Sequence, residues 1–438
     1  MAKVIAEHLS RQPVFIPIRI MAKILIYTLV FPPDQVSNAH VLANLVRGLK
    51  ELGHEIKILT TTPHYQTLPE ASAKQPLIPY LGRWIFKSDF EGVPCYHIKV
   101  PKTKGGLLKR IWTALLFHLR SLWFGRRKEL DCDVVIAFTP PPTIGIIASK
   151  IAKRHGACSI FSVCDLPFLL FDVASRRLKL LGKILRCFER SGFNGCDAVV
   201  GVTPSSIDYI CSQTTRNRVL NVIPDSVDLD IYRPHGKIND YSRKKNWEDK
   251  FVISYLGNIG KAQDFSPLPD VVTACSDLDV KFICAGSGLK YEELARTAKE
   301  LGNPKWEVWG HQLIDTTVMI NASSDLCLVL LDRKITKGSF PSKLYTIMAS
   351  ARPVLYYGPC ETDVGRLIRE NDLGWTIETG DIDGFVRAIR EAYSDPERRE
   401  RMGQNGLKLV GERYSTQVVA KQYHELIEKL LSMKKTSR

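Results

Sequence analysis

The start of one helix in this chain combines residues that are well suited to bind a phosphate. Pro341, Ser342 and Lys343 lead directly into an apolar stretch that begins with Leu344 and has helical spacing. The first turn of a helix offers unpaired backbone N–H groups and the positive end of the helix dipole, and Lys343 adds a full charge. An ordinary capped helix with a surface lysine would show the same pattern, so the stretch needs support from elsewhere in the chain.

A glycine loop earlier in the chain supplies that support. The apolar residues 252–256 predict a strand, and two glycines and a lysine follow at its end. Glycine lets a ligand approach the backbone closely, and a neighbouring lysine can neutralise a phosphate. The loop consists of Gly257, Asn258, Gly260, Lys261 and Gln263, and further turns follow at Gly286 and at Trp309, Gly310 and His311. Neither glycine loop has the spacing of a dinucleotide fingerprint, so the order of the whole set is the signal.

Alternating strands and helices are expected to position these loops. Residues 24–29 and 55–59 predict strands on either side of a helix over 41–52, which is a βαβ unit with parallel strands and a right-handed crossover. Further strands are predicted at 134–137, 158–163 and 198–202, and then at 252–256, 280–284, 306–309, 326–330 and 353–356. The predicted fold class is α/β, with two Rossmann-like, doubly wound parallel-sheet domains that face each other across a cleft.

The length of 438 residues also favours more than one domain, because a single core rarely grows so large. We expect residues 1–20 to be a disordered leader or an extension foreign to the natural protein. A Rossmann-like domain is predicted over 21–230, a polar linker over 231–250 and a second domain over 251–438. Ligands of such folds bind in the cleft between the carboxyl ends of the strands.

The composition points to an anionic partner and to a reducing compartment. The formal net charge is +15, which suits nucleic acid, an acidic membrane surface or a phosphorylated ligand. The eleven cysteines are scattered without zinc-site spacing, which favours reduced thiols in the cytosol. Three Asp-x-Asp strings could suggest a metal, but they fall in the linker and at element edges, so we expect no metal. They are Asp228 with Asp230, Asp277 with Asp279, and Asp381 with Asp383.

Two basic stretches interleave cations with large apolar side chains. Residues 102–128 contain Lys102, Lys104, Lys109, Arg110, Arg120, Arg126, Arg127 and Lys128 among leucines and tryptophans, and residues 168–186 repeat this chemistry. The apolar run is too short and too charged to span a bilayer, but it suits a helix lying on anionic lipid. The alternative is a pair of core-facing helices with solvated basic edges. Nucleic-acid binding is not expected, because the charges flank aliphatic runs.

The ordered set of motifs resembles the family-4 glycosyltransferases of the GT-B fold, and most of all the bacterial enzymes of the fucosamine-transferase and colanic-acid type. The matching strings in the second half are Gly257-Asn258-Ile259-Gly260 with Gln263, Pro341-Ser342-Lys343-Leu344, and Met348-Ala349 with Arg352-Pro353-Val354. Those in the first half are Thr62-Pro63-His64-Tyr65, Val100-Pro101-Lys102 and Asp165-Leu166-Pro167. The resemblance runs from about residue 21 to the C-terminus.

The resemblance implies retaining transfer of a sugar from a nucleotide diphosphate sugar, without a metal or other cofactor. Lys261, Lys343 and Asp165 would serve catalysis. The donor would be bound by Gly257, Asn258, Gly260, Lys261, Gln263, Gly286, Trp309, Gly310, His311, Pro341, Ser342, Lys343 and Leu344. Ser37, Asn38 and His64 would line the acceptor side.

The chain also departs from the pattern of many family members. Asn258 and Gln263 stand where those members have an arginine and a lysine, and Gly338 and Thr346 replace a pair of glutamates. Phe138 lies near the position of a histidine of their catalytic region. These differences leave the residue that contacts the donor ribose unassigned.

We therefore expect a hexosyltransferase that acts on a polyprenyl-diphosphate-linked saccharide in polysaccharide, exopolysaccharide or O-antigen biosynthesis. It would be a cytoplasmic protein, peripheral on the inner face of the cell membrane. The sequence leaves two alternatives open. One is a nucleotide-sugar epimerase on the same fold, and the other is a catalytically silent sugar-nucleotide-binding partner of a membrane complex.

Overall fold

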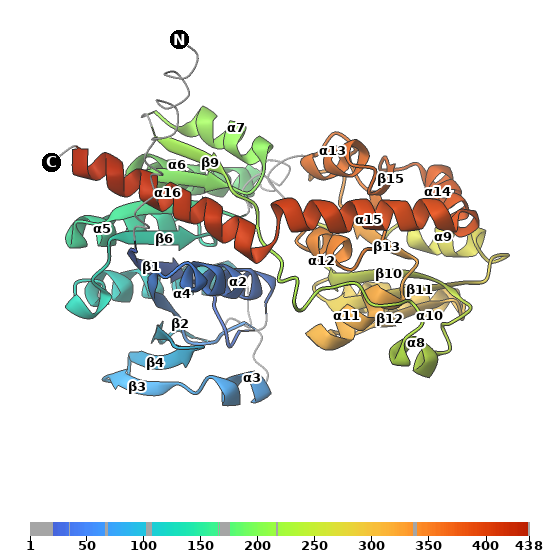
Figure 1. Cartoon of the computed structure of the whole chain (residues 1–438), viewed down its shortest axis with the longest axis horizontal. Coiled ribbons are helices and arrows are strands. Elements are labelled where there is room, and N and C mark those ends of the chain that lie inside the picture. Colours follow the sequence, from blue (N-terminus) through green and yellow to red (C-terminus); the bar gives the residue numbers. More distant parts are fainter. Residues whose placement is uncertain are drawn as a thin grey trace, which may run out of the picture.

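The computed structural model describes residues 21–34, 36–65, 69–101, 107–164, 166, 176–215, 218–335 and 340–436. It consists of two α/β domains that lie side by side and are joined by a linker and by a long helical segment at the C-terminal end (Figure 1). The predicted fold class is confirmed, since each domain is built around a largely or wholly parallel sheet.

The sheet of the first domain has nine strands in the order β3-β4-β5-β2-β1-β6-β7-β8-β9. Its parallel strands are β1 (Lys23–Thr28), β2 (Glu55–Thr61), β5 (Val93–Ile98), β6 (Val134–Phe138), β7 (Cys158–Val163), β8 (Ala198–Gly201) and β9 (Val219–Val222). At one edge, β3 (Ile78–Leu81) and β4 (Ile85–Phe90) add antiparallel pairs that the sequence pattern did not predict. The inner strands are buried on both faces, which explains their unbroken apolar runs.

Helices cover both faces of this sheet. On one face lie α4 (Leu107–Phe124), α5 (Ile144–His155), α6 (Arg176–Gly195) and α7 (Pro204–Gln213), which bury Phe117, Ile151 and Phe193 against the strands. The other face is covered by α2 (Ser37–Glu51), whose leucines pack on β1, β2 and β6. A short helix, α3 (Pro69–Lys74), precedes β3.

The sheet of the second domain is wholly parallel, in the order β12-β11-β10-β13-β14-β15. Its strands are β10 (Phe251–Asn258), β11 (Val280–Ser287), β12 (Trp306–Trp309), β13 (Leu326–Leu330), β14 (Val354–Tyr357) and β15 (Gly374–Ile377). The covering helices are α8 (Asp240–Lys245), α9 (Leu268–Ala274), α10 (Tyr291–Leu301), α11 (Ile314–Ser323), α12 (Lys343–Ala349), α13 (Asp363–Glu370), α14 (Ile382–Ser394) and α15 (Pro396–Arg413). The carboxyl ends of β10, β11 and β12 carry the predicted loops at one edge.

The last helix departs from the predicted domain division, which assigned everything after residue 251 to the second domain. After α15 the chain crosses back, and α16 (Thr416–Thr436) packs Val419, Tyr423 and Ile427 into the core of the first domain (Figure 1). The crossing segment pairs with the outgoing linker, because the N–H of Val227 donates to the carbonyl of Tyr414 at 2.9 Å. The physical reason is the apolar face of α16, which finds its partner on α2 rather than in the second domain.

Candidate functional site

The two glycine loops of the second domain lie side by side at the carboxyl end of its sheet. We call the surface formed by Gly257, Asn258, Gly260 and Gly286 the glycine ledge. Gly257 at the end of β10 lies in register with Gly286 on β11. A Cβ added to Gly286 would lie 1.7 Å from the carbonyl oxygen of Gly257, so no larger residue fits between the two strands. Gly257 itself has φ +127 and is exposed, which leaves its backbone open to a ligand.

The buried side chain of Gln263 forms hydrogen bonds that stabilise the glycine ledge. Its Oε1 accepts hydrogen bonds from the N–H of Gly260 at 3.1 Å and from Nδ2 of Asn258 at 3.4 Å. Gln263 is buried, whereas Asn258 and Lys261 are exposed at the front. Gln263 therefore shapes the loop, and Asn258 and Lys261 are the members of the loop whose side chains reach solvent.

The side chain of Lys343 lies beside Gly257 on the buried side of the glycine ledge. Lys343 is the first residue of α12, and its Nζ lies 3.5 Å from the centroid of the Tyr255 ring. A Cβ added to Gly257 would be 3.3 Å from the same Nζ. Among the residues that the structure describes, Nζ has no hydrogen-bond partner and is closed off from solvent. Burial holds the pKa of Lys343 well below its usual range.

The start of α12 also touches the first domain. The hydroxyl of Ser342 lies 2.9 Å from the hydroxyl of Ser37 at the start of α2. Leu344 is buried in the core of the second domain and anchors the helix, while Pro341 is half-buried. This hydrogen bond brings the predicted donor side and the predicted acceptor side of the cleft into direct contact.

At the end of β12, Trp309 contacts neighbouring side chains of the second domain, and its predicted place beside the nucleobase stays a prediction. The Trp309 ring stacks on Trp247, with centroids 5.8 Å apart, and its Nε1 donates to Glu307 at 2.8 Å. Its indole is thus engaged beside α8. His311 is exposed and close enough to lower the pKa of His40 on α2, after burial and the charge of Arg47. Of this segment, His311 is therefore the residue that lies near the opposite domain.

His64 is buried beneath the loop that follows β2. Its Nδ1 lies 2.9 Å from the hydroxyl of Thr61, and its backbone N–H donates to Asp34 at 3.2 Å. Burial lowers the pKa of His64 to about 4, so the imidazole is neutral at physiological pH. The side chain organises the loop, and its predicted acceptor role stays a prediction. Asp165, the predicted catalytic carboxylate, lies outside the described residues.

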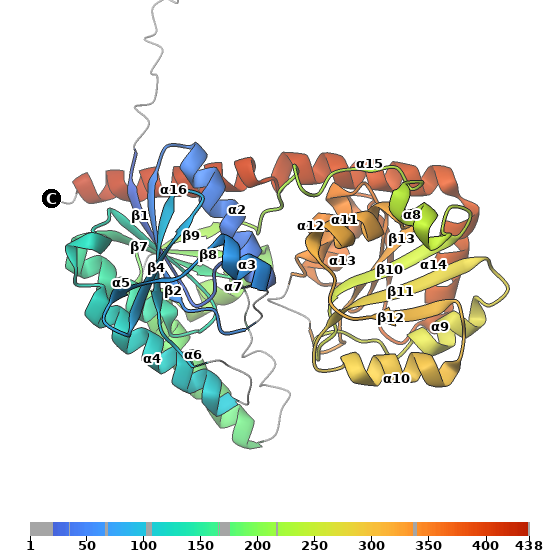
Figure 2. The same ribbon diagram turned by 90° about the horizontal axis from the view of Figure 1, so that it is seen from below.

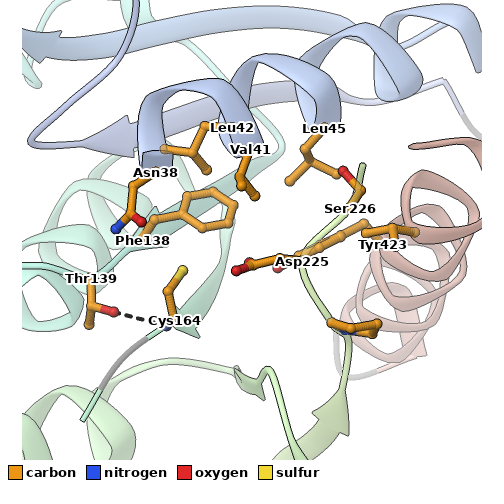
Figure 3. A pocket seen from close by; sticks show the side chains of 12 residues that line it. Asn38, Val41, Leu42, Leu45, Phe138, Thr139, Cys164, Asp225, Ser226 and Tyr423 are labelled. Atoms are coloured by element: carbon orange, nitrogen blue, oxygen red, sulfur yellow. Dashed lines mark hydrogen bonds between the residues drawn. The ribbon is translucent and has the colours of Figure 1, made fainter. Parts of the chain in front are cut away.

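A small recess opens beside the cleft at the carboxyl ends of β6 and β7 (Figure 3). It encloses about 390 Å³ of space, part of it open to solvent. The residues around it are Asn38, Val41, Leu42, Leu45, Phe138, Thr139, Cys164, Pro224, Asp225, Ser226, Val419 and Tyr423. The carboxylate of Asp225 points into the recess between Phe138 and Cys164 (Figure 3). We did not predict Asp225; the available signal was a carboxylate directly after the last strand of the first domain.

The outer helix α4 exposes large apolar side chains in addition to the phenylalanines that it buries in the core. Leu108 is 82% exposed, Trp112 54% and Leu119 57%, while Thr113 and Ser121 face the protein interior. The remaining exposed apolar residues of the helix are Ile111, Leu115 and Trp123. On the inner face, His118 bonds the hydroxyls of Tyr27 at 2.9 Å and Thr143 at 2.8 Å. The helix therefore carries apolar side chains on both faces, because Phe117 and Phe124 are buried in the core of the first domain. The alternative of a core-facing helix accounts for these two residues but not for the exposed ones.

This apolar stripe extends onto neighbouring elements of the first domain. Of the twenty large apolar side chains that the described residues leave exposed, eleven lie on α4, α6 and the β3–β4 hairpin. They are Ile78, Tyr80, Trp84, Leu108, Ile111, Trp112, Leu115, Leu119, Trp123, Ile184 and Phe188, which we call the apolar surface. In Figure 2, α4 and α6 run along the outer edge of the first domain. Exposed apolar clusters are typical of surfaces that bind proteins or membranes.

Cations border the apolar surface. The Arg120 guanidinium lies 4.0 Å from the Trp84 ring centroid, and that of Arg127 lies 5.8 Å from Trp123. Arg126, Lys128 and Arg154 line a hollow at the end of α4, together with Asp131 and His155. Lys102, Lys104 and residues 168–171 of the two predicted basic stretches lie outside the described part of the chain.

Within the described ranges, none of the helices is long and apolar enough to cross a membrane. The same ranges hold no cluster of three or more His, Cys, Asp or Glu side chains arranged to bind a metal ion. The Asp-x-Asp strings have structural partners: Asp277 pairs with Arg390, Asp279 with Lys250, and Asp381 caps the N-terminus of α14. Asp228 accepts from the N–H of Asp230.

The fold thus has two open sheets, with glycine loops at the carboxyl end of the second sheet and the start of α12 in contact with the first domain. Residues 39–225 match the glycosyl transferase 4-like domain, and residues 237–409 match the glycosyl transferases group 1. The chain belongs to the GT-B glycosyltransferases of the family-4 type, as its motifs predicted, and it is an enzyme of this class.

Individual relatives agree with this assignment. The chain is 23% identical over 395 residues to the putative colanic acid biosynthesis glycosyl transferase WcaI of Escherichia coli K12, covering 85% of this chain and 93% of WcaI. Its fold is similar to that of sucrose-phosphate synthase from Thermosynechococcus elongatus, with a TM-score of 0.74, 15% identity and coverage of 94% and 99% of the two chains. It is also similar to Anabaena HepE in complex with UDP and glucose, with a TM-score of 0.69, 13% identity and coverage of 93% and 100%.

Proposed function

We propose that this enzyme transfers a hexose, with retention, from a nucleoside diphosphate sugar to a saccharide carried on polyprenyl diphosphate. The proposal places it on the inner face of the cell membrane, in the assembly of a polysaccharide or O-antigen. The observation that carries it is the glycine ledge of the second domain, with Lys343 beneath it and the first domain directly opposite. The name of WcaI and the nucleotide bound to HepE are consistent with this substrate class.

The chemistry follows from the charge that develops on the donor. The bond between the sugar carbon and the phosphate oxygen breaks, the acceptor oxygen bonds to the same carbon, and the acceptor proton passes to the departing phosphate. Negative charge therefore grows on the nucleoside diphosphate. The exposed backbone of Gly257, the cation of Lys261 and the amine of Lys343 lie where they would stabilise that charge more in the transition state than in the ground state.

The apolar surface supports a lipid-linked acceptor. A large apolar side chain that leaves water for an apolar medium gains about 1.5–3 kcal/mol, and α4 exposes six such residues. Tryptophan at the headgroup level and nearby arginines are typical of helices that lie in a membrane interface. Apolar side chains exposed along a helix are unfavourable in water, whereas a bilayer surface would cover them.

A donor panel with a defined acceptor tests the proposal. Purified protein is incubated with UDP- and GDP-sugars and with a polyprenyl-diphosphate-linked saccharide in anionic vesicles, and products are identified by mass spectrometry. We expect release of nucleoside diphosphate that requires the acceptor, and an anomeric configuration of the product that matches the donor. The Lys343→Met variant and reactions without acceptor serve as controls.

Other outcomes would contradict specific parts of the proposal. Isomerisation of the donor without an acceptor would mean an epimerase on this fold. Equal turnover with a water-soluble acceptor that lacks the lipid, in the absence of vesicles, would remove the membrane part. We also expect turnover to survive EDTA, and its loss with EDTA and recovery with a divalent metal would contradict a metal-independent reaction.

A further inference from the structure

The groups near the Lys343 amine in the described part of the chain include an aromatic ring, a thiol and the backbone of Gly257. Tyr255 on β10 presents the face of its ring at 3.5 Å, and the Cys284 thiol on β11 is the other polar group that influences the amine. Nζ makes no hydrogen bond to a described residue and has no contact with solvent. A lysine in such a position lacks the hydrogen bonds that an ammonium group requires.

Neither neighbour can act as a counter-anion. Burial raises the pKa of the Tyr255 hydroxyl well above its usual value and raises that of the Cys284 thiol to about 12. Both groups are therefore neutral at physiological pH. Within the described part of the chain, no carboxylate contributes to the electrostatic environment of Lys343. An amine held this way favours its uncharged form until an anion arrives.

The exposed residue nearest to this amine on the loop is Gly257. A Cβ added to Gly257 would lie 3.3 Å from Nζ of Lys343, so the amine lies close to backbone that solvent reaches. Lys261, on the same loop, is exposed and bonded to none of the described side chains in the free protein. An anion that settles on the ledge would thus meet one exposed cation and one buried amine.

Building on the proposed donor site, we propose that Lys343 is an uncharged amine in the empty enzyme and takes up a proton when a nucleoside diphosphate binds beside Gly257. The proton comes from water or buffer and forms a new N–H bond at the Nζ lone pair. The ammonium produced pairs with the phosphate, so that no net charge is left unpaired beneath the ledge. Donor binding and protonation are then a single linked equilibrium.

The linkage has a definite sign. Since the bound state holds one more proton than the free state, affinity for the nucleotide falls as pH rises. Between the pKa of the free amine and that of the bound amine, the dissociation constant rises about tenfold for each pH unit. A lysine that carried its charge in both states would give no such slope.

Calorimetry of UDP and GDP binding tests the proposal. Each nucleotide is titrated into the whole protein at pH 8, where its terminal phosphate, with a pKa near 6, has already lost its second proton. Repeating the titration in buffers of different ionisation enthalpy gives the number of protons taken up. We expect close to one proton per nucleotide, and none for uridine, which lacks phosphate.

Two variants separate the buried amine from the exposed one. Lys343→Met keeps the length and fills the site with an apolar chain, so the protein should fold, and we expect it to bind UDP more weakly without proton uptake. Lys261→Met also removes a cation from the site, but it should leave the proton count near one. Thermal unfolding of both variants checks that the fold is intact.

The outcomes are distinguishable. Binding by the unmodified protein without proton uptake, or unchanged uptake in Lys343→Met, would overturn this inference while leaving the donor site in place. If neither UDP nor GDP binds, the proposed donor site fails together with the inference that rests on it.

Discussion

The covering helices of the two domains differ in which side chains they turn to solvent. In the second domain, α14 buries Phe385, Ala388 and Ile389 and leaves charged residues such as Arg387 outside. In the first domain, α4 also buries apolar residues, Phe117 and Phe124, but it exposes leucines and tryptophans on its outer face. The outer helix of one domain therefore presents charged residues to the outside, whereas that of the other presents large apolar residues. Two domains of the same fold class thus differ in surface patterning, and differences in binding arise from such surfaces rather than from the fold.

Their interiors offer a second contrast. The carboxylate of Glu189 on α6 and the amine of Lys343 on α12 are each closed off from solvent, and neither group has a hydrogen-bond partner in the described ranges. Lys343 borders the exposed backbone of Gly257, where a ligand can arrive, whereas Glu189 is only 1% exposed. We infer that the first group is available to a ligand and that the second affects stability.

The largest effect is expected from the apolar surface. Leu115→Glu combined with Leu119→Glu should lower the affinity for anionic vesicles by at least about a hundredfold, because each leucine contributes roughly 1.5–3 kcal/mol when it enters the interface. Vesicle co-sedimentation measures this. Ile238→Glu combined with Leu301→Glu adds the same charges at exposed apolar positions elsewhere, and it should bind as the unmodified protein does. Equal losses of vesicle affinity in both double variants would contradict a specific role of the apolar surface.

Glu189 should make the protein less stable as pH rises. Burial raises its pKa to about 8, above that of the unfolded chain, so the folded protein keeps a proton that the unfolded chain loses between about pH 4.5 and pH 8. The resulting loss of unfolding free energy is up to about 4 kcal/mol over that window. Glu189→Gln should remove it, so the variant should gain stability at pH 8 but little at pH 4.5, as measured by denaturant unfolding. A gain independent of pH would argue against this origin.

Lys343→Met should reduce turnover by about a hundredfold, because losing one preorganised cation typically raises the barrier by about 3 kcal/mol. Lys261→Met should cost less, about tenfold, since its cation is exposed and screened by solvent. Initial rates with saturating donor and acceptor measure both. A smaller loss for Lys343 than for Lys261 would reverse their assigned importance.

The smallest effect is expected at the contact between the domains. Ser37→Ala removes the hydrogen bond to Ser342, which is worth about 1 kcal/mol, and should raise the KM for donor a fewfold with little change in stability. Ser205→Ala is a matched control, because it removes another interdomain hydrogen bond, to Asp363, away from the glycine ledge. An equal change in KM for both would show that the Ser37 contact has no special role.

Sequence patterns predicted the interior of the fold better than its edges. The strand predicted at 134–137 is β6, because strands buried on both faces have continuous apolar runs. The β3–β5 edge was missed, since Ile78 and Tyr80 are exposed and give no apolar alternation. The return of α16 to the first domain depends on a surface of α2 that is distant in sequence, which local patterns do not encode.

In the candidate site, too, local sequence predicted some features, while others depend on tertiary packing. The glycine ledge and Lys343 were predicted from spacing, and the structure brings them together. The burial of Lys343 was not predicted, because it depends on the Tyr255 ring from another strand. The Trp309 indole packs on Trp247, an arrangement that only the tertiary structure reveals. Catalytic roles for Lys261, Lys343 and Asp165 remain predictions.

A structure of the protein with UDP or GDP bound tests the central claim most directly. We predict that the diphosphate lies on the backbone of Gly257 and Gly260, above the amine of Lys343 and beside Lys261. A nucleotide bound elsewhere, with its phosphates distant from both lysines, would contradict the account.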